Sequence, residues 1–568
     1  MQNIVNKLLA FSLIILAFAF HENVSAQKSS KYYIGFTDKN NSPYSVNAPE
    51  KFLSQRSIEK RRKFGIAITE EDFPVNQNYI DSILKTDKSN LLLTKSKWLN
   101  GITIYSEDTA LENKINGISF VDFIEKTVMI DSLEVFKVDS NRKYIDLKSP
   151  DRYDKTPQIA DYHYGKGKGQ IRVNNVHWLH RLGYTGRGMV MMVMDAGFHN
   201  VDTIKHFRKL REEGRLLGVK NFVLPDENLF RSGSHGTMVL SCIAAQLEGE
   251  LVGSSPDVSV YLAKTEDGRS EHKIEEDNWS AGVEWADSLG VDVLNSSLGY
   301  TKFDDSLVHP RHYADLNGLV SRASRTATIA SRKGLIICNS AGNEGSKPWH
   351  HIGAPADAEG ILTVGATFLN REKTPFSSFG PTADGRVKPD ACAVGGYTQV
   401  ANPKGKTTIA SGTSFSSPLL SGMVASLWQA FPQKNNTEIM DAIRRSGSQY
   451  NAPDSALGYG ITDFLRAYNI LYSADTTQTF YFNSFVANKE NKYKISFTFN
   501  SKEKQTIEVK VKSRKSNTEK TFIKKVKPKI TTISIPFSKI TDDWDIADIK
   551  ITLGGITRNY VAGIETTK

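Results

Sequence analysis

The stretch 411–418, Ser-Gly-Thr-Ser-Phe-Ser-Ser-Pro, decides how this sequence is interpreted. It places the Ser414 hydroxyl on a small, bend-tolerant turn, and the apolar run 419–431 that follows predicts a buried helix. A serine at a helix start is surrounded by backbone N–H groups and lies at the positive end of the helix dipole. This environment suits an oxygen that attacks a carbonyl group and then lies beside an oxyanion. Gly-Thr-Ser turns also occur in ordinary loops, so the stretch needs partners elsewhere in the chain.

Two upstream segments supply the groups that a nucleophilic serine requires. The apolar run 189–194 ends in Asp195-Ala196-Gly197, which is how a buried strand delivers a carboxylate to its tip. His235-Gly236-Thr237 opens the apolar stretch 238–245, which predicts another helix. A serine is a weak nucleophile until a base takes its proton, and a carboxylate fixes the tautomer of a histidine base. The three motifs together therefore indicate nucleophilic catalysis.

These motifs, in the order Asp195, His235, Ser414, resemble those of the subtilisin-like serine peptidase family. The order itself is a property of subtilisin. The resemblance covers roughly residues 165–468 and implies that the three residues form a catalytic triad. Two departures are small: Ala196 replaces the family's usual Thr or Ser, and Phe415 with Ser416 replaces the commoner Met-Ala. Neither departure removes a reacting atom.

Two further motifs carry the resemblance. Ser340-Ala341-Gly342-Asn343 follows the apolar run 334–338, and the family implies that the Asn343 amide points at the developing oxyanion. The segment 291–299 ends in Ser-Leu-Gly, whose backbone pairs with extended substrates in the family. The resemblance thus implies six candidate substrate contacts: Ser297, Leu298, Gly299, Ser340, Ala341 and Gly342.

The hydrophobic pattern around these motifs predicts an α/β fold. Short apolar runs alternate with longer helical patterns at 278–288 and 321–332; the runs are 189–194, 258–262, 291–294, 335–338 and 361–364. Such alternation indicates a mostly parallel sheet with helices on both faces. Ligand sites in these sheets lie at the carboxyl ends of strands. Asp195 and Asn343 both follow strand ends, as a shared site requires.

The segment 27–130 has its own pattern, a β-α-β-β-α-β order that predicts a ferredoxin-like unit. This order resembles the inhibitory prosegment of subtilisin-like peptidases and implies that the unit covers the active site until it is removed. An insertion at 49–73 is rich in basic residues: Arg56, Lys60, Arg61, Arg62 and Lys63. We interpret it as an amphipathic helix with a solvated basic face rather than as a processing site.

The first 26 residues have the composition of a secretory signal. Lys7 precedes the apolar stretch 8–20, and Val24-Ser25-Ala26 is a small-residue cleavage site. The alternative is an uncleaved membrane anchor. We expect export to the periplasm, the cell surface or the medium. The polar bridge 131–160 is the predicted linker in which maturation cleavage falls, and 161–473 is the predicted catalytic domain.

The carboxyl-terminal segment 477–568 alternates apolar and polar residues with period two. This pattern predicts antiparallel strands in a small all-β, sandwich-like domain, with Pro536 on an edge strand. The segment holds 18 Lys and Arg against 9 Asp and Glu, so it carries +9 of the chain's formal charge of +10. A basic face suits contact with an anionic envelope or an acidic polymer, but we favour a role in solubility. Nucleic-acid binding is not expected, because the lysines lack interleaved aromatic residues.

Composition argues against a metal or disulfide framework. The three cysteines, Cys242, Cys338 and Cys392, lack metal-ligand spacing and lie in apolar surroundings. The polar insertion 300–315 contains His309 and His312, and we expect a solvated loop there rather than a metal or substrate site. No cofactor is required by a triad, and calcium binding stays unassigned. We expect the protein to act as a monomer.

The leading hypothesis is a secreted serine endopeptidase that acts on polypeptides and is made as a zymogen with its own prosegment as inhibitor. The alternative is a catalytically impaired subtilisin-fold protein that serves in binding or adhesion. A lipase or esterase would instead need a Gly-x-Ser-x-Gly turn followed by Asp and then His. Ser414 comes last of the three residues, which argues against that class.

Overall fold

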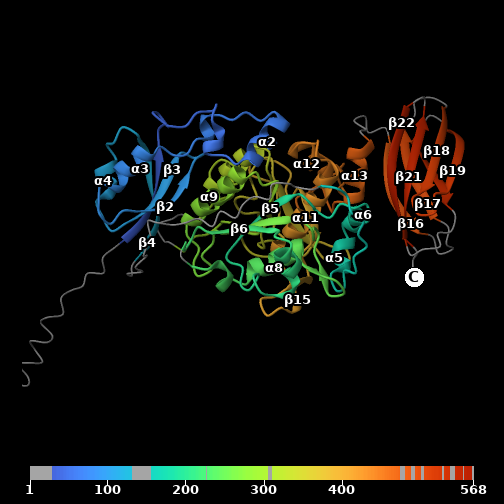
Figure 1. Ribbon diagram of the computed structural model, residues 1–568, viewed down its shortest axis with the longest axis horizontal. Coiled ribbons are helices and arrows are strands. Elements are labelled where there is room, and N and C mark those ends of the chain that lie inside the picture. The colour runs from blue at the N-terminus through green and yellow to red at the C-terminus, as the bar shows by residue number, and fades with distance from the viewer. Residues whose placement is uncertain are drawn as a thin grey trace, which may run out of the picture.

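The structure is a computed structural model that describes residues 29–130, 155–225, 227–304, 310–473, 480–487, 493–500, 505–526, 530–537, 544–553 and 556–565. The predicted signal peptide, His309 and residues 131–154 of the predicted linker lie outside the described residues. Figure 1 shows three units in chain order: an N-terminal unit (29–130), a central unit (155–473) and a C-terminal unit of strands (480–565).

A seven-stranded sheet forms the middle of the central unit. Its order is β13-β12-β11-β10-β5-β9-β6, and each neighbouring pair is parallel. The strands, in chain order, are β5 (Val190–Asp195), β6 (Leu216–Asn221), β9 (Ser259–Lys264), β10 (Val293–Ser296), β11 (Ile336–Ser340), β12 (Leu362–Thr367) and β13 (Ala391–Val394). The predicted α/β class with a mostly parallel sheet is therefore confirmed.

Helices cover both faces of this sheet because its strands are apolar on both sides. Met191 and Val193 of β5 pack in one cluster with α8 (His235–Ala244) and α11 (Thr413–Ala430). The alternate residues Val190, Met192 and Met194 pack in a second cluster with α9 (Ile274–Leu289) and α10 (Arg322–Arg332). Successive side chains of a strand point to opposite faces, so a strand buried on both faces is apolar throughout.

Shorter elements complete the central unit. The helices are α5 (Lys168–Arg172), α6 (Val176–Arg181), α7 (Arg208–Glu212), α12 (Asn436–Arg445) and α13 (Phe464–Ser473). The strands are β7 (Gln246–Leu247), β8 (Leu251–Val252), β14 (Thr398–Ala401) and β15 (Thr407–Ala410), and the 3-10 turns are η3 (Lys205–Phe207), η4 (Leu229–Arg231) and η5 (Tyr313–Asp315). A solvated loop was predicted at 300–315, but only part of this insertion is solvated. Tyr300 and Arg311 are buried, whereas His312 is exposed.

The N-terminal unit is an antiparallel sheet in the order β2-β3-β1-β4, with helices packed on one face. Its strands are β1 (Ser29–Phe36), β2 (Leu91–Ser96), β3 (Gly101–Ser106) and β4 (Val121–Ile130), and the helices of its core are α3 (Gln77–Leu84) and α4 (Leu111–Ile115). Ile102 and Ile104 of β3 point into this core, whereas the intervening Thr103 donates a hydrogen bond to Asp277 of α9. The other face of the sheet thus meets the central unit.

The insertion 49–73 forms η1 (Pro49–Lys51), α2 (Gln55–Phe64) and η2 (Glu70–Asp72). Figure 1 shows α2 reaching from the N-terminal unit over the central unit. The prediction of a solvated basic face is wrong for this helix. Lys60 and Arg61 are only 7% and 1% exposed, because they face acidic groups and carbonyls of the central unit, whereas Arg62 and Lys63 are exposed.

The C-terminal unit contains two antiparallel sheets. One has the order β19-β18-β21-β22 and the other β16-β17-β20. The strands are β16 (Phe480–Ala487), β17 (Tyr493–Asn500), β18 (Gln505–Ser513), β19 (Glu519–Val526), β20 (Ile530–Phe537), β21 (Trp544–Leu553) and β22 (Ile556–Glu565). Pro536 lies in β20, at the edge of its sheet among the described strands.

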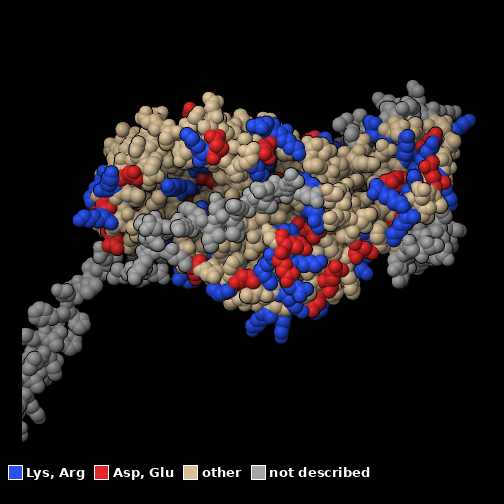
Figure 2. Space-filling view, viewed as in Figure 1, with Lys and Arg blue, Asp and Glu red and all other residues tan. Residues whose placement is uncertain are grey.

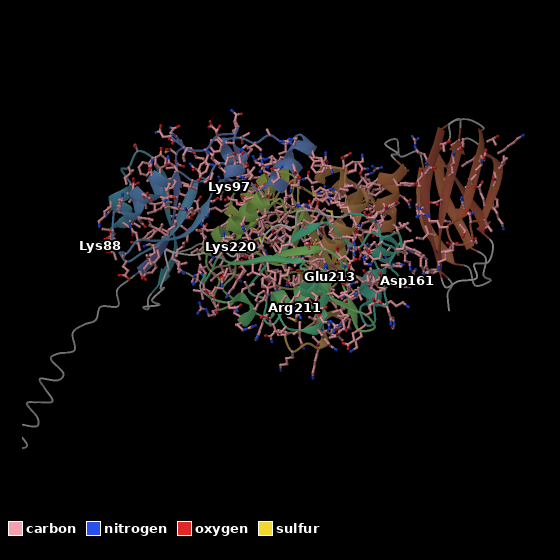
Figure 3. The ribbon with its side chains drawn as sticks, viewed as in Figure 1. Lys88, Lys97, Asp161, Arg211, Glu213 and Lys220 are labelled. Carbon is pink, nitrogen blue, oxygen red and sulfur yellow. The ribbon has the colours of Figure 1, made fainter. Side chains whose placement is uncertain are left out.

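The C-terminal unit is joined to the central unit by packing and hydrogen bonds. Ile546 and Val561 belong to the same apolar cluster as the central helices, and Asn469 of α13 pairs with the backbone of Val561. Asp161, labelled in Figure 3, accepts a hydrogen bond from the Trp544 indole. On the face in Figure 2, basic and acidic side chains of this unit are interspersed.

Two predictions about sequence segments can be compared with the described residues. All three cysteines are buried and free, as expected for small apolar side chains. Among the described helices, none is long and apolar enough to cross a bilayer.

Candidate active site

Asp195 and His235 meet at the carboxyl edge of the central sheet. Asp195 is the last residue of β5 and is fully buried, and His235 is the first residue of α8. The His235 Nδ1 atom lies 2.9 and 3.0 Å from the two carboxylate oxygens of Asp195. The negative charge of Asp195 raises the pKa of His235, although burial opposes the shift. The imidazole is thereby held with Nδ1 toward the carboxylate and Nε2 on its other side.

A glycine next to His235 makes this approach feasible. A Cβ atom on Gly236 would lie 2.4 Å from the carbonyl oxygen of Gly197 and 2.9 Å from the Cβ atom of Asp195. Contacts this short cannot be accommodated without movement of the backbone, so only glycine lets α8 begin directly against the end of β5. This steric requirement explains why glycine follows histidine in the motif.

Ser414 is the second residue of α11, and a proline, Pro418, follows it four residues later within the same helix. Pro418 has no N–H to donate to the Ser414 carbonyl, which lies four residues earlier. The Ser297 hydroxyl donates to that carbonyl instead, at 2.9 Å. The Ser414 hydroxyl in turn makes a long contact of 3.5 Å to the Ser297 carbonyl. Ser297 follows β10 directly, so this exchange fixes the start of α11 at the carboxyl edge of the sheet.

The described residues give Ser414 Oγ no hydrogen bond to His235. The two residues are nevertheless close, because the rings of His235 and Phe415 lie 5.7 Å apart between centroids. Phe415 is buried, so the aromatic residue that departs from the family pattern packs against the imidazole. A different rotamer of Ser414 is needed to direct its hydroxyl toward His235.

Asn343 is fixed beside the start of α11. Its Oδ1 atom accepts hydrogen bonds from Thr413 N at 2.9 Å and Thr413 Oγ1 at 3.0 Å. No hydrogen bond between described residues uses its Nδ2 group. Thr413 was not singled out from the sequence, although it lies inside the quoted Gly-Thr-Ser turn.

The six predicted substrate contacts are divided between exposed and buried positions. Leu298 is partly exposed and Gly299 is exposed, and both follow the end of β10 without belonging to a strand. Gly299 has no side chain, so its exposure is that of the backbone, whereas the Leu298 carbonyl accepts a hydrogen bond from Asn339 Nδ2 at 3.2 Å. Gly342 is also partly exposed, whereas Ser297, Ser340 and Ala341 are buried.

Comparisons with known proteins identify the family of the central region. Residues 186–460 match the family model described as Subtilase family, Peptidase_S8. Residues 186–460 belong to the subtilase family. Residues 31–143 match a second model, the Peptidase S8 propeptide domain of Bacteroidota, so an N-terminal prosegment precedes the subtilase region.

Similar proteins include subtilisin amylosacchariticus of Bacillus subtilis subsp. amylosacchariticus and subtilisin J of Geobacillus stearothermophilus. Each is 29% identical over 274 residues, which are 48% of this chain and 63% of the relative. Alkaline elastase YaB of Bacillus sp. (strain YaB) is 24% identical over 267 residues, 47% of this chain and 61% of the relative. The chain thus covers less than two thirds of the length of these relatives. A solved structure, MycP1 with its N-terminal propeptide removed, aligns with 53% of this chain and 96% of that chain at 21% identity, with a TM-score of only 0.41.

An acidic cluster that the sequence did not indicate lies near the candidate active site. The carboxylates of Glu266, Glu271 and Glu275 lie within 4.8 Å of one another. Burial and Glu271 raise the pKa of Glu275 to about 8, and burial, Asp304 and Glu276 raise that of Glu271 to about 7. Calcium usually takes six to eight oxygen ligands, so three carboxylates alone do not define a calcium site.

The fold places this cluster next to the predicted catalytic residues. Thr265, which precedes Glu266, donates its backbone N–H to the Asp195 carbonyl, at 3.2 Å. Tyr300, which follows Gly299, donates its hydroxyl to Glu266 at 2.6 Å. The spacing of Glu271 and Glu275 by four residues was a local signal, but only the fold brings Glu266 to them.

Proposed function

We propose that this protein is a serine endopeptidase that hydrolyses polypeptides through Asp195, His235 and Ser414. The observation that supports this most directly is the hydrogen bond of His235 Nδ1 to a buried carboxylate, next to the helix start that carries Ser414. Histidine held in this way is a base on its Nε2 side. Membership of residues 186–460 in the subtilase family supports the same activity.

In the proposed first step, the Ser414 hydroxyl turns from the Ser297 carbonyl and attacks the carbonyl carbon of a peptide bond. His235 Nε2 takes the hydroxyl proton as the C–O bond forms, and Asp195 stabilises the resulting imidazolium. The negative charge on the substrate oxygen is bound by the Asn343 Nδ2 group and the Ser414 N–H. Loss of such a side-chain donor costs about 10²–10³ in rate, a magnitude known from subtilisin itself.

In the second step, His235 gives its proton to the leaving amine, the C–N bond breaks, and an acyl-enzyme remains on Ser414. Water then attacks the ester with His235 again as base, which releases the acid and restores the serine. Leu298 and the exposed Gly299 are the proposed pairing segment for the extended substrate. Ser340, Ala341 and Gly342 are the proposed opposite side of the binding site.

We further propose that the chain is an exported zymogen and that the N-terminal unit inhibits it until the chain is cut upstream of residue 155. Two observations support the position of the cut. Gln158 and Ala160 donate backbone hydrogen bonds to Gly183 and His180 of the central unit, so the chain is already bound to that unit there. We also propose that the protein is a monomer, that it requires no cofactor, and that the basic charge of the C-terminal unit aids solubility, with contact to an anionic surface as the alternative.

Labelling with a serine-directed phosphonate tests the assignment. We expect the purified protein, once its N-terminal unit has been removed, to be labelled on Ser414 and to lose peptide hydrolysis in proportion. Ser414→Ala should be neither labelled nor active, and Ser411→Ala, on the same turn, serves as the matched control. Hydrolysis by Ser414→Ala at the rate of the unmodified protein would contradict the proposal. An unlabelled but folded protein would instead support the binding-protein alternative.

A further inference from the structure

Helix α2 binds the edge of the central sheet that is opposite the candidate active site. Its partners Gly290, Val291 and Asp292 precede β10, whereas Ser297 follows the same strand. A strand advances about 3.3 Å per residue, so Asp292 and Ser297 are separated by roughly 16 Å along β10. The contacts of α2 are therefore separate from any contact that the N-terminal unit makes at the catalytic edge.

A buried ion-pair cluster holds Arg61 in this position. Its guanidinium donates to both oxygens of Asp72, at 3.0 and 3.1 Å, and to both oxygens of Asp287, each at 2.9 Å. Asp72 belongs to the N-terminal unit and Asp287 to α9 of the central unit. Lys97, from the turn after β2, adds a third contact to Asp287 at 2.9 Å. Because both acidic groups are buried, neither can be satisfied by water if Arg61 is lost.

Two neighbouring basic residues extend the contact along α2. Arg56 pairs with Asp292 and donates to the Gly290 carbonyl at 2.9 Å, and Lys60 donates to the Val291 carbonyl at 2.6 Å. Arg56 and Lys60 thus bind the turn between α9 and β10 through a side-chain charge and backbone carbonyls, next to the contact of Arg61 with the last turn of α9. The two exposed basic residues of the helix, Arg62 and Lys63, take no part in these bonds.

The shape of the central unit also matches this helix. A Cβ atom on Gly290 would lie 2.7 Å from the backbone N of Ser57, and one on Gly334 would lie 2.7 Å from Ile66. Gly290 and Gly334 precede β10 and β11, so the helix and the turn after it approach both strands closely. Phe64 also packs on Trp428 of α11, with ring centroids 6.3 Å apart.

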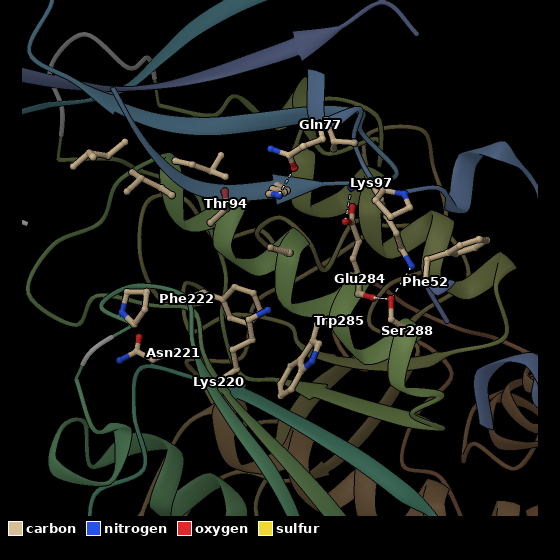
Figure 4. Close-up of a pocket in the computed structure, with 18 of the residues that line it drawn as sticks. Phe52, Gln77, Thr94, Lys97, Lys220, Asn221, Phe222, Glu284, Trp285 and Ser288 are labelled. Atoms are coloured by element: carbon tan, nitrogen blue, oxygen red, sulfur yellow. Dashed lines mark hydrogen bonds between the residues drawn. The ribbon is translucent and has the colours of Figure 1, made fainter. Parts of the chain in front are cut away.

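The sheet of the N-terminal unit contacts the same helix α9 through separate buried hydrogen bonds. Ser96 and the backbone N–H groups of Lys97 and Trp98 donate to Glu284, and Thr103 donates to Asp277. A cavity of about 870 Å³ lies between β2 and α9, lined by Thr94, Lys220, Phe222 and Trp285 among others (Figure 4). At its border, Lys97 reaches across to Asp287 and Ser288. The contact of α2 with the last turn of α9 and residues 290–292 is therefore a second contact, beside that of the sheet.

We propose that residues 49–73 form a second anchor that, in addition to the contact of the sheet, holds the N-terminal unit on the central unit away from the catalytic edge and so slows its release after the chain is cut between residues 131 and 154. The surface that receives it comprises the last turn of α9 and residues 290–292. Once the N-terminal unit leaves, this surface exposes Asp287 and Asp292, and the partner it fits is a basic amphipathic helix of this kind. This proposal rests on the proposal that the chain is a zymogen, but its test does not require catalytic activity.

The test uses the full chain with Ser414→Ala, so that no autolysis occurs. The recognition sequence of a site-specific protease is inserted after residue 140, the chain is cut, and dissociation of the N-terminal unit is followed by gel filtration and by surface capture. We expect the cut complex to remain associated. Arg61→Met should dissociate about 100-fold faster, since it leaves Asp72 and Asp287 buried with one cation fewer. Arg62→Met, on the exposed side of the same helix, should dissociate like the parent.

Melting of the uncut chains separates loss of the anchor from loss of folding. If Arg61→Met does not fold, Arg56→Ala, at a less buried position, takes its place and should dissociate at least tenfold faster. Dissociation of the parent complex immediately after the cut would overturn the proposal. So would equal dissociation rates for Arg61→Met and Arg62→Met, or for Arg56→Ala and Arg62→Met. These outcomes do not depend on peptidase activity, whose own test is labelling of Ser414.

Discussion

The Ser297 hydroxyl donates a hydrogen bond to the carbonyl of Ser414 at 2.9 Å, in place of the helical bond that Pro418 cannot form. This bond joins the end of β10 to the first turn of α11. It places the predicted nucleophile by satisfying a backbone group that would otherwise be buried without a partner. Two serines that are 117 residues apart in sequence are thereby coupled in one small structural element.

Ser297→Ala should impair both stability and the position of Ser414. Leaving a buried carbonyl unsatisfied costs about 1–3 kcal/mol of the free energy of unfolding. We expect kcat to fall by about tenfold with a smaller change in KM, because the nucleophile loses its alignment. Urea unfolding and steady-state kinetics on a peptide substrate measure the two effects. Ser426→Ala is the matched control, since Ser426 bonds the Ser254 carbonyl further along α11 and should affect stability without lowering kcat.

The pH dependence of activity should follow His235. The base must be neutral to accept the Ser414 proton, and Asp195 raises its pKa above the ordinary value of 6.5. We therefore expect kcat/KM to be low in acid and to rise with pH through an apparent pKa above 6.5. Asp195→Asn should lower kcat by about 10⁴-fold and move this apparent pKa downward. A profile in Asp195→Asn with an unchanged midpoint would show that another group controls the activity.

The glutamate cluster should make the protein less stable as pH rises. Burial, Asp304 and Glu276 raise the pKa of Glu271 to about 7, above the ordinary 4.5, so the folded state binds more protons than the unfolded state between these values. The free energy of unfolding must then decrease as pH increases across this window. Glu271→Gln removes the charge, so we expect its Tm to exceed that of the parent at pH 8 and to equal it near pH 4.5.

Glu359→Gln is the control for this change, because Glu359 is an exposed carboxylate outside the cluster. It should show no such pH-dependent gain in Tm. If Glu271→Gln melts at the parent temperature at both pH values, the carboxylates do not repel one another in the folded protein.

Hydrophobic periodicity and strand-end motifs were sufficient to predict the central fold. The run 189–194 is apolar at every position because β5 is covered on both faces, and such a run must end where the chain leaves the sheet, at Asp195. The helices after His235 and Ser414 follow from the apolar stretches behind them. Local pattern therefore located the predicted catalytic residues at one edge of the sheet.

Long-range electrostatic partners could not be predicted in this way. A basic helix is normally solvated on its charged side, and the pattern of 49–73 contains nothing that distinguishes Arg61 from Arg62. The difference arises from Asp287, which is 226 residues away, and from the orientation of α2 on α9. Pro418, by contrast, was a usable signal, since a proline four residues after Ser414 requires another donor for that carbonyl.

The contact between the C-terminal and central units should depend on the shape of Arg181 as well as its charge. Its guanidinium lies 4.9 Å from the ring centroid of Trp178 and 4.5 Å from that of Trp544, and it pairs with Glu565 and Asp161. Lysine keeps the charge but cannot stack between two rings or donate to both carboxylates in one plane. We expect Arg181→Lys to release the C-terminal unit about tenfold faster in limited proteolysis with an added protease, with Ser414→Ala present to prevent autolysis.

Arg208→Lys is the control for this change. It lies at an exposed pair with Glu212 and should be cut at the parent rate. Equal rates for all three chains would mean that the apolar contacts of Ile546 and Val561 hold the units together without Arg181.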